Sequence, residues 1–176
     1  MPTVQPPGPA AGADEVVQRL RAVGSTVATA ESLTGGLVCA TLVDVPGASA
    51  VVRGGMVAYA GDLKHSVLGV PAEVLQRHGT VSRECAEEMA RGARRLLGAD
   101  WGVATTGVAG PDPSEDRPVG TVHVAVAGVL GGEHITEQRA LTLDGDRAQI
   151  RTATVRAALR LLHDTLSGHC RTGDVP

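Results

Sequence analysis

The sequence predicts a single α/β domain with a mixed β-sheet that is covered by helices on both faces. Its 176 residues, of which 43% are hydrophobic, are enough for one ordinary core but not comfortably for two. Strand-like and helix-like segments alternate through the first part of the chain, as in a sheet that contains parallel strands. Two strand segments then meet at Gly131-Gly132, a pair typical of an antiparallel hairpin. We therefore expect one domain over residues 14–168, a disordered Pro/Gly/Ala-rich tail at 1–13 and a flexible tail at 169–176.

Helices and strands are expected in turn along the first half of the chain. Asp14 offers a side chain that can cap a helix, and Gly24 ends that helix. Gly54 and Gly55 fall inside the second strand segment and predict a bulge or a close backbone approach there. The predicted elements are a helix over 14–23, a strand over 26–30, a helix over 37–43, a strand over 51–59 and short helices over 61–68 and 71–78.

The second half of the chain begins with a longer predicted helix. Ser82 can cap its start, and the helix is expected to end near Gly98. One stripe of this helix is apolar and contains Ala86, Met89, Ala90, Ala93, Leu96 and Leu97. The remaining predicted elements are a buried strand over 101–105, strand segments over 119–129 and 133–143, and a final helix over 146–166.

Composition and charge exclude several classes of protein. The net charge is −3, from 16 basic and 19 acidic residues, which argues against binding to a nucleic-acid backbone. Tyr59 and Trp101 are the only aromatic residues, too few for a platform that stacks bases. Three widely spaced cysteines, no secretion signal and apolar segments too short for a membrane span predict a soluble, cytoplasmic protein. The six histidines show no metal-ligand spacing, so neither a metal nor another cofactor is expected.

Two glycine-containing turns follow predicted strands whose carboxyl ends are expected at one edge of the sheet. The first, Glu31-Ser32-Leu33-Thr34-Gly35-Gly36, opens a helix and exposes backbone N–H groups at the positive end of its dipole. This turn could bind an anion, or Ser32 or Thr34 could only cap the helix. In the second, Thr106-Gly107-Val108-Ala109-Gly110-Pro111, glycines allow a ligand to approach the backbone and Thr106 offers a hydroxyl. A plain turn between strand and loop is the alternative.

Two basic residues are candidates for chemistry. Lys64 is the only lysine among the 16 basic residues, and lysine, unlike arginine, can lose its proton when it is desolvated. With Ser49 and Tyr59 it could form a nucleophile and base that need neither His nor Asp; the alternative is that Lys64 is a solvated residue. Arg147, at the start of the last helix, could bind a phosphate or a carboxylate, or could be an ordinary exposed residue.

These segments together resemble the CinA C-terminal domain family over about residues 14–166. The resemblance depends on the order of six blocks. They are Ala28-Thr29-Ala30-Glu31-Ser32-Leu33-Thr34-Gly35-Gly36, Pro46-Gly47-Ala48-Ser49, Tyr59 with Lys64, His78-Gly79-Thr80-Val81-Ser82, Thr106-Gly107-Val108-Ala109-Gly110-Pro111, and Pro118-Val119-Gly120-Thr121-Val122. Characterised members of this family are nicotinamide-nucleotide amidohydrolases. They convert nicotinamide mononucleotide and water to nicotinate mononucleotide and ammonia without a metal, in pyridine nucleotide recycling.

The resemblance implies a role for each candidate residue. Ser49 would be the nucleophile, Lys64 the general base and later the acid, and Tyr59 a group that orients or relays the proton, with Ser32 as the rival nucleophile. The substrate would be bound by Ser32, Thr34, Gly35, Gly36, Thr106, Gly107 and Arg147, the last on its phosphate. A homo-oligomer is expected. A nucleotide- or partner-binding module without turnover, and hydrolysis of another amide, remain alternatives. One reason is that residues 112–118 replace a glycine-rich loop ending in Lys-Pro-Val-Gly that many relatives carry.

Overall fold

A five-stranded mixed sheet organises the chain, of which the computed structural model describes residues 12–168. The strand order is β2-β1-β3-β4-β5. Strands β2 and β3 run parallel to the central β1, whereas β4 is antiparallel to β3 and β5 is antiparallel to β4. Their bounds are β1 Val27–Glu31, β2 Val52–Val57, β3 Trp101–Gly107, β4 Thr121–Leu130 and β5 Glu133–Thr142. The predicted α/β class and the antiparallel hairpin at Gly131-Gly132 are confirmed.

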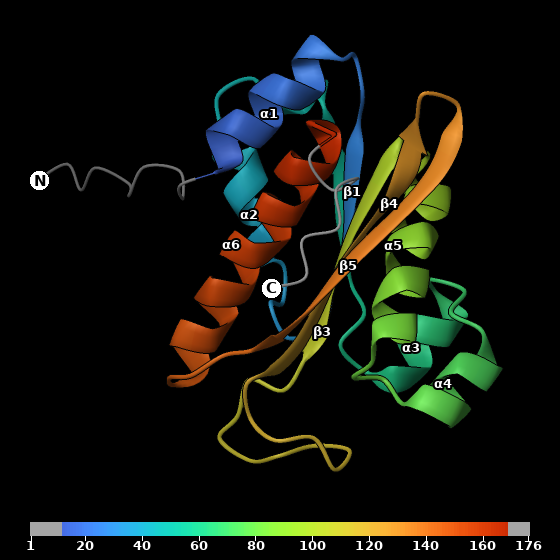
Figure 1. Ribbon diagram of the computed structural model, residues 1–176, viewed down its shortest axis with the longest axis vertical. Coiled ribbons are helices and arrows are strands. Elements are labelled where there is room, and N and C mark those ends of the chain that lie inside the picture. Colours follow the sequence, from blue (N-terminus) through green and yellow to red (C-terminus); the bar gives the residue numbers. More distant parts are fainter. Residues whose placement is uncertain (1–11, 169–176) are drawn as a thin grey trace, which may run out of the picture.

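Helices cover both faces of this sheet (Figure 1). On one face lie α1 Ala13–Ala22, α2 Leu37–Val43 and the long α6 Arg147–Leu166, and on the other lie α3 Gly61–Ser66, α4 Ala72–His78 and α5 Arg83–Leu97. A 3-10 turn, η1 Ala48–Ala50, precedes β2. No helix within residues 12–168 is both long and apolar enough to cross a membrane. The tails expected at 1–13 and 169–176 lie outside the described residues, except that α1 begins at Ala13.

The ends of the elements agree with the predicted ends to within two residues because strong local signals set them. Ser82 caps α5 by accepting a hydrogen bond from the Cys85 N–H, and Gly98 ends this helix in the left-handed conformation. At α6, Asp146 and Gln149 form a reciprocal capping box. The predicted irregularity in β2 is also present, since the register against β1 shifts by one residue after Val52.

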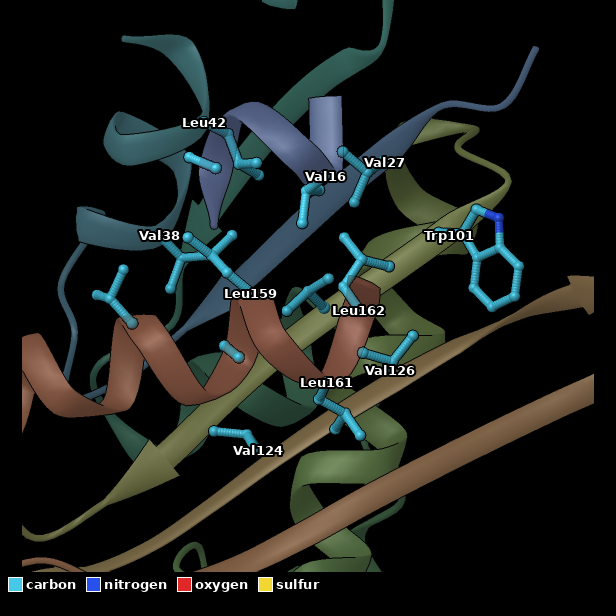
Figure 2. Close-up of a cluster of buried hydrophobic side chains, with 14 of the residues drawn as sticks. Val16, Val27, Val38, Leu42, Trp101, Val124, Val126, Leu159, Leu161 and Leu162 are labelled. Carbon is cyan, nitrogen blue, oxygen red and sulfur yellow. The ribbon is translucent and has the colours of Figure 1, made fainter. Parts of the chain in front are cut away.

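The two faces of the sheet carry side chains of different size. Larger residues such as Val27, Trp101 and Val124 face α1, α2 and α6, where they form the cluster drawn in Figure 2. The other face carries alanines that pack against α5: Ala28, Ala30, Ala104, Ala125 and Ala127. Gly102 is part of the same close contact, because a Cβ there would collide with the carbonyl of Ala90 on α5. Small residues therefore let α5 lie directly on the sheet.

The parallel strands β1, β2 and β3 all end at the same edge of the sheet. Three segments follow these ends: the turn at 31–36, the connection from Tyr59 into α3, and the loop that begins at Gly107. In open α/β sheets, ligands bind beyond the carboxyl ends of the strands. The topology therefore brings the sequence candidates from these three segments to one place.

Candidate active site

A cavity of about 240 Å³ opens at this edge of the sheet. Its walls come from the turn after β1, the start of α3, the segment before α5, the loop after β3 and the first residue of α6. Six predicted site residues line it: Ser32, Tyr59, Lys64, Thr106, Gly107 and Arg147. Residues separated by more than 100 positions in the sequence thus meet at one site, as the topology requires.

Lys64 is almost completely buried although it carries an ionisable amine. Helix α3 places it inside the cavity wall, where its side chain is 1% exposed. Its Nζ lies 2.9 Å from the carbonyl oxygen of Ala58 and 3.4 Å from that of Tyr59. The third partner is the hydroxyl of Ser32, at 3.1 Å. The three hydrogen-bond partners of this lysine within residues 12–168 thus come from the residues that directly follow β1 and β2.

Burial lowers the pKa of Lys64, because desolvation penalises the ammonium form. Interactions with Cys85, Glu115 and Tyr59 oppose this effect without cancelling it. A neutral amine has two hydrogens and one lone pair. The two hydrogens can serve the carbonyls of Ala58 and Tyr59, which leaves the lone pair facing the Ser32 hydroxyl. This geometry suits a base that removes the proton of Ser32.

The amino end of α2 is already occupied by the carboxylate of Glu31. This side chain is 1% exposed and accepts hydrogen bonds from the backbone N–H groups of Gly36 and Val38, both at 3.0 Å, and of Cys39 at 2.8 Å. Of the two alternatives for this turn, neither describes the helix end: its amides are taken by Glu31 rather than left for an anion, and neither Ser32 nor Thr34 caps it. Sequence reasoning missed this role of Glu31, although an acidic residue beside a helix start is a known signal for it.

Thr34, Gly35 and Gly36 do not line the cavity, so the structure does not bring them together with the other predicted substrate-binding residues. The hydroxyl of Thr34 is buried and hydrogen-bonds that of Thr105 at 2.7 Å. Gly35 and Gly36 both have a positive φ and shape the turn instead. From α6, Arg151 donates to the carbonyl oxygens of Leu33 and Thr34, each at 3.0 Å. These residues fix the turn that presents Ser32.

Ser49 lies outside the cavity, and the structure corrects its expected pairing with Lys64. Ser49 is exposed in η1, which precedes β2, whereas Lys64 follows the carboxyl end of the same strand. The six residues of β2 separate these two ends by about 20 Å, at roughly 3.3 Å per residue. The serine that lies beside Lys64 is the rival candidate, Ser32.

The other predicted residues form the rim of the cavity. Arg147 donates to the carbonyl oxygen of Gly110 at 2.7 Å and to the hydroxyl of Tyr59 at 3.1 Å, and both Arg147 and Tyr59 are exposed. Thr106 donates its hydroxyl to the carbonyl of Thr80 at 2.7 Å. Gly107 is required by the sheet itself, since a Cβ there would lie 2.6 Å from the carbonyl oxygen of Thr121. The rim is thus held together by the side chains of Arg147, Tyr59 and Thr106, two of which bind backbone carbonyls of other segments.

With this geometry established, comparison with known proteins identifies the family. Residues 10–166 match the CinA C-terminal domain. The chain belongs to the CinA family. A CinA-like protein from Frankia casuarinae is 52% identical over 144 residues, which are 82% of this chain and 32% of that relative. A putative competence-damage inducible protein from a Geobacillus species is 49% identical over 142 residues, 81% of this chain and 33% of its own length. The chain thus spans about a third of the length of the curated relatives it matches.

Solved structures of CinA-type proteins share the fold over almost their whole length. The competence damage-inducible protein A of Klebsiella pneumoniae superposes with a TM-score of 0.84 at 36% identity, covering 92% of this chain and 98% of that one. A competence/damage inducible protein from Agrobacterium tumefaciens gives a TM-score of 0.81 at 38% identity, covering 93% of this chain and 99% of that one. The resemblance inferred from the motifs is confirmed at the level of the family.

Proposed function

We propose that this chain is an amidohydrolase that converts nicotinamide mononucleotide and water to nicotinate mononucleotide and ammonia, and so acts in pyridine nucleotide recycling. The observation that carries the proposal is the contact between Lys64 and Ser32 in the cavity wall. A buried lysine whose pKa is lowered, beside a serine hydroxyl, is a nucleophile and base for acyl transfer. The motif resemblance supplies the substrate.

In the proposed first half-reaction, the Ser32 Oγ attacks the carbon of the carboxamide while the Lys64 Nζ takes the hydroxyl proton. The resulting tetrahedral intermediate collapses when the C–N bond breaks, and the Lys64 ammonium returns the proton to the departing ammonia. In the second half-reaction, water attacks the ester on Ser32 with Lys64 again as the base. Nicotinate mononucleotide leaves, and both side chains return to their starting states.

The backbone N–H of Leu33 is a candidate to stabilise the charge that develops on the carbonyl oxygen. Leu33 lines the cavity directly after Ser32, and within residues 12–168 no acceptor takes its N–H. A fixed donor at this position is typically worth about 3 kcal/mol of the barrier. Arg151 holds the Leu33 carbonyl, which belongs to the next peptide unit, and so fixes the backbone on the C-terminal side of this donor before substrate arrives.

Arg147 is proposed to bind the phosphate of the nucleotide. Its guanidinium is exposed at the rim and uses its two terminal nitrogens on Gly110 and Tyr59, which fixes its plane. A guanidinium has five N–H donors, so others remain for phosphate oxygens. Tyr59 is then a residue that orients Arg147, rather than a proton relay.

The test measures ammonia and nicotinate mononucleotide released from nicotinamide mononucleotide by the wild type and by three variants. Ser32→Ala and Lys64→Arg are expected to lose at least about a thousandfold in kcat, because each removes one half of the reacting pair. Ser49→Ala is the matched control, since this exposed serine lies outside the cavity, and it is expected to keep its turnover within twofold. Loss of turnover in Ser49→Ala with retention in Ser32→Ala would overturn the assignment. Binding of the nucleotide without turnover by the wild type would favour a binding module instead.

A further inference from the structure

The loop over residues 110–118 forms one wall of the cavity and ends in an unusual turn. Gly110, Asp112 and Ser114 line the cavity. Ser114 and Arg117 exchange two backbone hydrogen bonds, of 2.9 and 3.2 Å, and thereby close a two-residue turn. The residues between them, Glu115 and Asp116, have φ values of 51° and 58°. Glycine and asparagine are the usual residues at such positions, so a non-glycine pair here requires contacts that hold it.

Glu115 makes those contacts with the segment before α5, which forms another wall of the cavity. Its carboxylate accepts the backbone N–H of Thr80 at 2.7 Å and the hydroxyl of Thr80 at 2.6 Å. The preceding Gly79 leaves room for it, because a Cβ at that position would lie 2.7 Å from the Glu115 Oε2. Partial burial would raise the pKa of Glu115, but hydrogen bonds from Thr80 and the Val81 backbone outweigh it and lower the pKa. The carboxylate is therefore held in its charged form.

We propose that Glu115 is a positioning residue that latches the 110–118 loop onto Thr80 and so closes the wall against which the substrate binds. Thr80 lines the cavity and accepts the hydroxyl of Thr106 through its carbonyl, so the latch joins the loop to both neighbouring walls. Arg147 holds the other end of the loop through Gly110. Glu115 itself does not line the cavity and acts through the loop. The effect on catalysis rests on the proposed amidohydrolase function, whereas the latch can be measured without it.

The same carboxylate acts on Lys64 through space. The titratable groups that face Lys64 are Cys85 on α5, Tyr59 after β2 and Glu115 on the loop. Burial raises the pKa of the Cys85 thiol to about 12, so this group is uncharged at neutral pH. The negative charge of Glu115 favours the ammonium form of Lys64 and partly offsets the effect of burial on its pKa. Neutralising Glu115 should therefore lower the pKa of Lys64 further.

Two pairs of variants separate the contact from the charge. Glu115→Ala removes the latch, and Asp116→Ala is its matched control. Asp116 has the same left-handed backbone conformation, and its side chain makes no hydrogen bond or ion pair within residues 12–168. Glu115→Gln keeps the shape and can still accept from the Thr80 N–H, and Asp116→Asn is its control. The measurements are hydrogen exchange of the 110–118 amides, KM and kcat for nicotinamide mononucleotide, and the pH dependence of kcat/KM.

We expect Glu115→Ala to accelerate loop exchange and to raise KM, each about tenfold relative to Asp116→Ala, with kcat within about twofold. Glu115→Gln should shift the acidic limb of kcat/KM to lower pH, because the base then loses its proton more readily, whereas Asp116→Asn should leave that limb in place. Equal exchange rates in Glu115→Ala and Asp116→Ala would overturn the latch. An unmoved limb in Glu115→Gln would overturn the electrostatic part. If the wild type has no amidase activity, the exchange comparison still decides the latch, so the two failures are distinguishable.

Discussion

Replacing Glu31 with glutamine tests whether one buried carboxylate holds the turn that presents Ser32. The Glu31 Oε2 accepts from the N–H groups of Gly36 and Val38, and Oε1 accepts from the Cys39 N–H and, at 3.2 Å, from the Thr29 hydroxyl. Glutamine has the same shape but replaces one of these oxygens with an NH₂ group, which donates. In either orientation of the amide, at least one backbone N–H faces another donor.

The expected loss of stability is about 3 kcal/mol. With the glutamine oxygen placed toward Gly36 and Val38, those two bonds survive without charge assistance and each weakens by roughly 0.5–1 kcal/mol. The N–H of Cys39 is left without an acceptor, at about 1–3 kcal/mol, while the Thr29 hydroxyl can rotate to accept instead. A domain of this size is stable by only about 5–15 kcal/mol, so this is a large fraction.

Urea unfolding followed by the fluorescence of Trp101, the only tryptophan, measures this loss. With an m-value of about 2 kcal/mol/M, the midpoint should fall by roughly 1.5 M without a change in m. Glu73→Gln is the control, because Glu73 is likewise a glutamate near the start of a helix, here in the first turn of α4, but is exposed, and it should cost less than about 0.5 kcal/mol. A loss below about 1 kcal/mol in Glu31→Gln would refute the reasoning, since Glu31 would then not be what orders the turn.

Two further predictions concern the core and the buried lysine. In Gly128→Ala, the new Cβ would collide with the indole of Trp101. We therefore expect the free energy of unfolding to fall by about 2–4 kcal/mol in the same assay. A fall below about 1 kcal/mol would contradict this, because it would mean that the strand can shift to make room. Burial lowers the pKa of Lys64 in the folded protein. At a pH between this lowered value and the ordinary pKa of lysine, the unfolded chain therefore binds more protons than the folded one. The contribution of Lys64 to the free energy of unfolding rises with pH over that range and stops rising once the unfolded lysine also loses its proton. The free energy of unfolding of the wild type should therefore increase relative to Lys64→Met between pH 7 and 10, and a constant difference would contradict this.

The order and ends of the elements could be predicted because their signals are local. Ser82 and Asp146 cap helices through contacts three residues ahead, and Gly98 ends a helix through its own φ of 60°. Glycine pairs likewise marked the irregular strand β2 and the β4–β5 hairpin. Each of these signals lies within a few residues of the feature that it marks.

The roles of Glu31, Arg151 and Glu115 could not be predicted, because their partners depend on the tertiary fold. Arg151 lies 117 and 118 positions from the carbonyls that it holds, and Glu115 lies 35 positions from Thr80. Nothing in the local pattern around either residue indicates which distant segment it meets. Glu31 is different, since its backbone partners are only five to eight residues away, and its position before a helix carried a usable signal.

The choice between the two serines shows how sheet topology decides which residues can react. Ser49 is 15 positions from Lys64 in the sequence, and Ser32 is 32 positions away. A strand lies between Ser49 and Lys64, so they are separated by its length, at opposite edges of the sheet. Ser32 follows β1, and Lys64 follows β2. These strands are parallel neighbours, and their carboxyl ends lie side by side because Glu31 pairs with Val57 in the register. Residues that follow adjacent parallel strands are therefore brought together, while residues that flank one strand are kept apart by its length. Applied to the sequence, this rule would have favoured Ser32 over Ser49 before any distance was measured.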